Sequence, residues 1–153
     1  MAELDDTLDQ QINQLCARGD ELAEEEKFAE AVAEYDRAWA LLPEPKQQWN
    51  AATWILAAIG DAHVLRGDFA GAHNALSAAM HCPDAIGNPF IHLRLGQAQF
   101  ELGNLDRAAD ELMRAYMGAG PEIFAMEDEK YLQFLATRAQ GIEFPDAAEV
   151  DLD

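Results

Sequence analysis

The stretch LAAIGDAHVLRGDFAGAHNALSAAMHCP, residues 56–83, spaces its small and large apolar residues in a pattern that recurs twice in the chain. The same frame fits residues 15–43 and residues 92–120. The matching positions are Gly19, Gly60 and Gly96; Phe28, Phe69 and Leu105; Ala31, Ala72 and Ala108; Tyr35, Leu76 and Leu112; and Ala38, Ala79 and Ala115. Self-similarity over units of this length predicts stacked helical repeats.

Close packing explains the pattern. Each copy predicts two antiparallel helices, and a small residue is needed where the two backbones cross, because a larger side chain would hold them apart. Alanine is abundant and β-branched residues are scarce, which favours helices over a sheet. We therefore expect an all-α fold, with a generic alanine-rich bundle as the alternative. The predicted helices span residues 7–25, 28–42, 46–66, 69–82, 88–103 and 105–118.

Helix ends support this frame. Gly67 and Gly103 stand where a helix should stop, and Asp68 and Asn104 follow as caps of the next helix. The first copy has Glu-Glu-Lys-Phe at this place, so its turn must form without glycine. The first two copies are offset by seven residues more than a regular 34-residue repeat would give, which predicts an extended helix at 46–66.

The repeated pattern resembles that of the tetratricopeptide repeat (TPR) family. The resemblance lies in the spacing of the small residues, the large apolar position between them, and the closing prolines Pro43 and Pro83. The resemblance covers about residues 12–120 and implies a TPR-type α-solenoid of three helix pairs, with repeats at about 12–43, 53–83 and 89–120. A further helix at 127–140 has an apolar face and is expected to cap the last pair. We expect one domain over 1–140 and a mobile acidic tail over 141–153.

Charge restricts the partners. The formal net charge is −19, from 29 acidic and 10 basic side chains. A phosphate backbone would be repelled, and so would an anionic membrane, whereas a basic protein would be attracted. The acidic N-terminus lacks the features of a signal peptide, and Cys16 and Cys82 show no disulfide spacing. We expect a cytoplasmic protein that binds neither nucleic acid nor membrane.

Catalytic patterns are missing from the sequence. Ser77 has no glycine elbow, and His81 and Cys82, adjacent on a helix, point apart. The four histidines show neither an i, i+4 pair nor a zinc-binding spacing. We therefore expect no catalytic residue, no metal site, no cofactor and no enzymatic activity.

In a TPR array the first helix of each pair lines a concave groove, and the resemblance transfers this role to matched positions here. An apolar floor with an acidic rim suits a basic, amphipathic segment of another protein. Alternatively, the aromatic members pack against neighbouring helices or the tail. The predicted partner-binding residues are Asp20, Glu24, Trp54, Asp61, Leu65, Phe90, Leu93, Gln97, Phe100 and Glu101.

Residues 115–138, AYMGAGPEIFAMEDEKYLQFLATR, resemble the ends of small bacterial TPR proteins encoded beside Rhs or type VI polymorphic toxins. Such proteins act as immunity proteins, which bind and silence a toxin domain. The resemblance implies a protein-binding module that occludes a basic toxin or effector domain. The alternatives are a secretion chaperone or adaptor that docks a peptide in the groove, and a self-associating scaffold, so the oligomeric state stays open.

Overall fold

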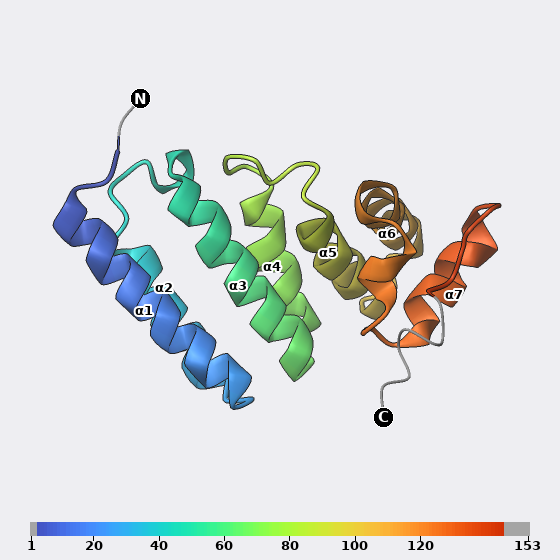
Figure 1. Ribbon diagram of the computed structural model, residues 1–153, viewed down its shortest axis with the longest axis horizontal. Coiled ribbons are helices and arrows are strands. Elements are labelled where there is room, and N and C mark those ends of the chain that lie inside the picture. Colours follow the sequence, from blue (N-terminus) through green and yellow to red (C-terminus); the bar gives the residue numbers. More distant parts are fainter. Residues whose placement is uncertain (1–2, 146–153) are drawn as a thin grey trace. The chain divides into compact units, whose positions relative to one another are not determined.

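Residues 3–145, which the computed structural model describes, contain seven α-helices, two short 3-10 helices and no β-strand (Figure 1). The all-α prediction is confirmed. The chain falls into two compact units, unit 1 (Met1–Ile86) and unit 2 (Gly87–Asp153). The helices of unit 1 are α1 (Asp6–Glu24), α2 (Phe28–Ala40), η1 (Lys46–Gln48), α3 (Asn50–Arg66) and α4 (Phe69–Ala79). Those of unit 2 are α5 (Pro89–Glu101), α6 (Leu105–Ala119), η2 (Pro121–Phe124) and α7 (Glu129–Arg138). The single domain expected over residues 1–140 stays a prediction.

Unit 1 is built from two helix pairs that share a core. Helix α1 packs on α2, α3 packs on α4, and α2 also packs on α3. The core residues come from all four helices and are largely small or aliphatic, which lets the helices approach closely. They include Ile12, Ala31, Val32, Tyr35, Ala38, Leu42, Ala52, Ile55, Leu56, Ile59, Ala62, Ala79 and Cys82.

The glycines of the repeat frame lie where the paired helices come closest. A Cβ atom on Gly19 would lie 2.5 Å from the Tyr35 ring, and one on Gly96 would lie 2.8 Å from the Leu112 side chain. Both partners occupy the same frame position, so the contact is equivalent in the α1–α2 and α5–α6 pairs. The predicted reason for the glycines is therefore confirmed.

The turns inside the three pairs have the same hydrogen bonds, although only two contain glycine. Gly67 and Gly103 adopt left-handed φ values of 84° and 86°, and Glu26 adopts the same conformation at 62°. In each turn the next N–H bonds a carbonyl five residues back, as in Asp68 to His63 at 2.8 Å and Lys27 to Leu22 at 2.9 Å. Glu26 thus takes the role of the missing glycine.

The caps after these turns differ from one another. The Asp68 carboxylate accepts a hydrogen bond from the Gly71 N–H at 3.0 Å, as predicted for a helix cap. Asn104 also stands at the predicted N-cap position, that of α6, but its side chain makes no capping hydrogen bond and donates to Gln99 at 2.8 Å instead.

The long connection between the first two pairs is not an extended helix, so the prediction of one helix over 46–66 was wrong. Residues Lys46–Gln48 form the separate η1, Trp49 is extended, and α3 begins only at Asn50. The Lys46 ammonium donates to the carbonyls of Trp39 and Leu42 at 3.0 and 2.7 Å, which satisfies the end of α2. The indole of Trp49 donates to the Pro43 carbonyl at 2.9 Å.

Unit 2 has one helix pair closed by its C-terminal segment. Helix α7 packs on α6 and confirms the helix predicted at 127–140, with shorter bounds. The core residues are Leu93, Leu112, Ala115, Phe124, Tyr131, Leu132 and Leu135. The mobility expected of the tail from residue 141 stays a prediction, but its first residues contact unit 2: Ile142 packs on this core, and the Glu143 N–H bonds the Tyr116 hydroxyl at 2.8 Å. The rest of the predicted tail, from 146, lies outside the described residues.

Candidate functional site

The predicted binding residues of unit 1 lie on the two helices α1 and α3. Figure 1 shows these helices running in the same direction, with α2 behind α1. On each helix the predicted residues are four, seven or eleven positions apart, which places them along one stripe. We call these two stripes the α1–α3 face. It comprises Asp20 and Glu24 on α1, and Trp54, Asp61 and Leu65 on α3.

Tyr35, on α2, supports the acidic part of this face through a hydrogen bond to Asp20. Its side chain is 3% exposed and reaches out from α2. The hydroxyl donates a 2.6 Å hydrogen bond to the Asp20 carboxylate. Burial, the bond to Asp20, and the negative charges of Asp20 and Asp61 all raise the pKa of Tyr35 above its ordinary value. The hydrogen bond fixes the Asp20 carboxylate over the Tyr35 hydroxyl.

The apolar part of the face is a pair of large side chains on α3. Trp54 is 66% exposed and Leu65 is 50% exposed, although most of α3 is buried. The helix is held by the Thr53 hydroxyl, which donates to the Pro83 carbonyl at 2.7 Å, and by its packing on α2 and α4. Large apolar side chains on a rigid, exposed stripe are typical of binding surfaces.

The acidic part of the face has no internal neutralisation on α1. Asp20 and Glu24 make no ion pair with a described residue, and Glu24 is exposed. The raised pKa of the half-buried Cys16, caused by burial and by Asp20, indicates a neutral thiol beside these carboxylates. The face therefore offers negative charge and apolar surface, with no reactive group.

Two predicted residues of unit 2 do not reach the surface. Leu93 and Gln97 are each 1% exposed, so the prediction that they contact a partner was wrong. Leu93 belongs to the core of unit 2. The Gln97 amide lies between Arg94 and Glu127, with hydrogen bonds of 2.8 Å to each.

The chain's own helix α7 covers two more predicted residues of unit 2. The Phe100 ring makes edge contacts with Tyr131 and Phe134, at centroid distances of 5.5 and 5.1 Å. The Glu101 carboxylate accepts from the Tyr131 hydroxyl and pairs with Lys130, both at 2.7 Å. Burial, followed by this bond to Glu101, raises the pKa of Tyr131. The alternative that the aromatic residues pack within the chain is thus confirmed for Phe100.

The remaining predicted residue of unit 2, Phe90, is 40% exposed and carries a cation on its ring. The guanidinium of Arg94 lies 5.1 Å from the ring centroid. Arg94 is itself buried and paired with Glu127 at 2.6 Å. Sequence reasoning missed Arg94, although it is a basic residue one helical turn after an aromatic in a chain with few cations.

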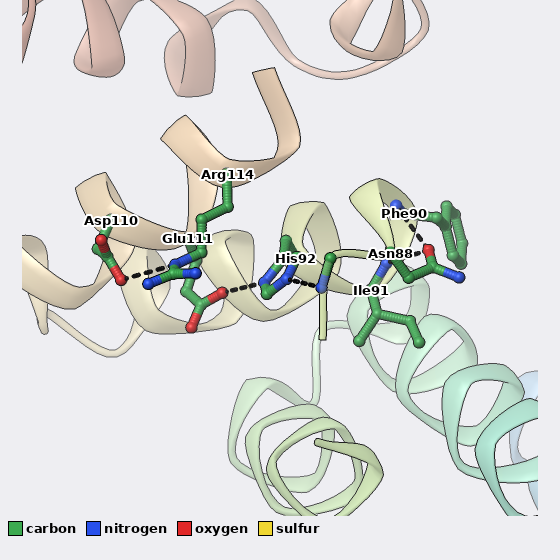
Figure 2. A network of polar contacts seen from close by, with 8 residues as sticks. Asn88, Phe90, Ile91, His92, Asp110, Glu111 and Arg114 are labelled. Carbon is green, nitrogen blue, oxygen red and sulfur yellow. Dashed lines mark hydrogen bonds and ion pairs between the residues drawn. The ribbon is translucent and has the colours of Figure 1, made fainter. Parts of the chain in front are cut away.

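His92 is fixed by a buried network, which Figure 2 shows. Its Nε2 accepts from the Gly87 N–H at 2.9 Å, and its Nδ1 donates to the Glu111 carboxylate at 2.5 Å. Asn88 caps the same helix by accepting from the Phe90 and Ile91 amides at 3.0 and 3.2 Å. Both ring nitrogens of His92 are occupied, so the ring has a structural role, as expected for the histidines.

The other candidate reactive groups are also placed in structural surroundings. Cys82 is buried, and its thiol donates to the Ala78 carbonyl at 3.6 Å, away from the exposed His81. Within residues 3–145, no three His, Cys, Asp or Glu side chains are arranged to hold a metal ion. In the same range no helix has the length and apolar character that crossing a membrane requires.

The described residues thus offer the α1–α3 face as the candidate site, which combines exposed apolar side chains with carboxylates. In comparisons with known proteins, no family model and no curated protein matches the chain.

Proposed function

We propose that this chain is a protein-binding module that recognises a basic protein through the α1–α3 face. The observation that carries the proposal is the exposure of Trp54 and Leu65 on α3, together with the exposed carboxylates of Asp20 and Glu24 on α1. Buried aromatic anchors within a charged surround dominate the energy of protein interfaces. The net charge of −19 adds long-range attraction for a positive partner and repels nucleic acid.

The proposed architecture is a TPR-type α-solenoid. Its support is the equivalence of the three helix pairs, each with a frame glycine opposite a frame large residue. The three turns also share one hydrogen-bond pattern. A repeat of this kind presents the first helix of each pair to a partner, and α1 and α3 hold that place in unit 1.

The specific role that we propose is that of an immunity protein in the cytoplasm, which occludes a cognate basic toxin domain. Toxins that act on nucleic acid are basic, and an acidic cognate would associate fast and cover the active cleft. The stretch 115–138 that resembles such proteins supplies buried residues of unit 2, such as Phe124, Tyr131 and Leu135. It therefore supports a shared fold, and the α1–α3 face supplies the argument for the partner.

A secretion adaptor is the second candidate, because Trp54 and Leu65 lie on one stripe of a single helix. Eleven residues of helix span about 16 Å, which is the length of roughly five residues of extended peptide. An adaptor would bind a short peptide with most of the affinity of the whole partner. An immunity protein would need the folded domain, because its contacts come from a surface rather than from a segment.

Co-expression tests the proposed role. Each protein encoded beside this gene would be produced in a bacterial host, first alone and then together with this chain. We expect one neighbour to arrest growth and this chain to restore it, while a variant carrying Asp20→Lys and Glu24→Lys restores growth poorly. If no neighbour arrests growth, or if the charge-reversed variant protects equally well, the proposed role is wrong.

A further inference from the structure

Cations over aromatic rings are unusually frequent in this acidic chain. About one such contact is expected per 70–80 residues. Residues 3–145 contain five, made by only four cations, Lys46, Arg94, Lys130 and Arg138. The rings beneath them are those of Trp39, Phe90, Phe100, Tyr131 and Phe134. Four of the ten basic residues of the chain thus lie over aromatic rings.

Trp54 departs from this pattern. It is the most exposed aromatic side chain among the described residues, at 66%, and it has no cation over its ring. The residues three and four positions away on α3 are Asn50, Ala51, Ala57 and Ala58. Their side chains are too short to lie across an indole, so both the ring and the space above it are accessible.

Phe90 occupies the position in unit 2 that is equivalent to Trp54, and a cation covers its ring. Trp54 and Phe90 each lie six residues before a frame glycine, Gly60 and Gly96. The residue four positions later is Arg94 in one case, where its guanidinium stacks at 5.1 Å, and Ala58 in the other. Unit 2 therefore supplies its own arginine to this ring, and unit 1 does not.

We propose that Trp54 receives an arginine side chain of the bound protein, which takes the place over the indole that Arg94 takes over Phe90. The aromatic face attracts a guanidinium through its quadrupole, and tryptophan does so most strongly. A guanidinium also stacks flat on a ring, which the ammonium of lysine does not. This inference rests on the proposed function and names the group that the α1–α3 face recognises.

The carboxylates of α1 add negative charge to the same face. Asp20 and Glu24 are exposed, and neither makes an ion pair with a described residue. They raise the local concentration of a positively charged segment, so the arginine that Trp54 receives belongs to a basic stretch of the bound protein.

A peptide pair tests the inference with the full chain. The probe is a capped helical peptide of alanine and glutamine with arginines along one face, and its partner has leucines in their place. Dissociation constants at low salt would be measured for the wild-type chain, Trp54→Phe and Trp54→Leu, together with the indole N–H signal of Trp54. All three proteins should keep the same circular dichroism, because the ring is largely exposed.

We expect Trp54→Leu to weaken the arginine peptide by about 3- to 30-fold, Trp54→Phe to weaken it less, and neither to affect the leucine peptide. Equal losses for both peptides, or no loss with the arginine peptide, would overturn the inference and leave Trp54 as an apolar anchor or a bystander. The growth assay does not depend on Trp54 alone. A chain that protects against its neighbour but fails the peptide test would refute only this inference.

Discussion

Gly60 of α3 lies so close to Leu76 of α4 that a methyl group on Gly60 would stand 2.3 Å from the Cγ atom of Leu76. Leu76 is completely buried, and the close atom is its Cγ rather than the end of a flexible side chain. The contact therefore sets the separation of the two helices, and the position of α3 in turn fixes where Trp54 and Asp61 stand. The glycine of the repeat pattern at position 60 thus helps to set the position of the proposed binding face.

Adding that methyl group should destabilise the protein. In an exposed helix Gly→Ala stabilises by roughly 0.5–1 kcal/mol, but here overpacking should win and Gly60→Ala should cost about 1–3 kcal/mol. Urea unfolding followed by circular dichroism measures this. The control is the same change in a Leu76→Ala background, where the space exists and the cost should largely disappear. A stabilised Gly60→Ala protein would show that the helices are not in this contact.

Replacing Glu26 by glycine should stabilise the turn between α1 and α2. Glu26 has a φ of 62°, and the left-handed conformation costs a residue with a side chain about 1–2 kcal/mol. Part of that gain is lost because glycine is more flexible in the unfolded chain, so we expect a net gain of about 0.5–1 kcal/mol. The neighbouring Glu25→Gly, at a φ of −85°, is the matched control and should not stabilise. Equal effects from both changes would exclude this explanation.

Removing the Glu127 carboxylate should destabilise unit 2, because it breaks the 2.6 Å ion pair with the buried Arg94 and the hydrogen bond from Gln97. We expect Glu127→Ala to cost about 2–3 kcal/mol, somewhat less than the roughly 3–5 kcal/mol of a fully buried pair, since Glu127 keeps some exposure. The exposed Glu129→Ala lies two residues away and should change the free energy of unfolding by less than about 0.5 kcal/mol. Thermal unfolding of both variants checks this, and similar losses would mean that the pair is not important.

His63 should make stability fall in mild acid. Burial lowers the pKa of His63 below its ordinary value, against the opposing effect of Asp68. The unfolded chain therefore takes up the proton first as the pH falls below about 6.5, and the free energy of unfolding decreases. His63→Gln lacks this loss, so its stability relative to the wild type should rise between about pH 8 and pH 5.5. Urea unfolding at both pH values measures the difference, and a constant difference would contradict the assignment.

The sequence predicted the pair architecture well because the close contacts require specific residue types. Glycine at three matched positions has one steric explanation, and the structure places a large frame residue opposite each. The connection after Pro43 was harder, because its shape depends on Lys46 reaching the carbonyls at the end of α2. No local pattern predicts a tertiary hydrogen bond of this kind. The left-handed conformation of Glu26 was equally difficult to predict, because it is imposed by the packing of the two helices that Glu26 joins.

The predicted binding residues also separate into those that local periodicity placed correctly and those whose exposure depends on distant segments. Periodicity correctly placed Trp54 and Leu65 on an exposed stripe, because the helix fixes which residues share a face. It could not predict which part of that stripe another segment covers. In unit 2 the segment from η2 to α7 supplies Glu127 and Tyr131, which bury Gln97 and occupy Glu101. These contacts join residues about 30 positions apart, and they depend on the path of the chain after α6.

The central claim is that the α1–α3 face attracts a basic protein by its charge, and the association rate constant tests this most directly. Stopped-flow mixing of the chain with the neighbour-encoded protein that arrests growth in the co-expression test would be measured at about 50 mM and about 500 mM salt. The account predicts a fall of at least about tenfold in the wild type, and a much smaller fall in the Asp20→Asn and Glu24→Gln double variant. A wild-type rate constant that does not change with salt, or a double variant with the same salt dependence, would contradict it.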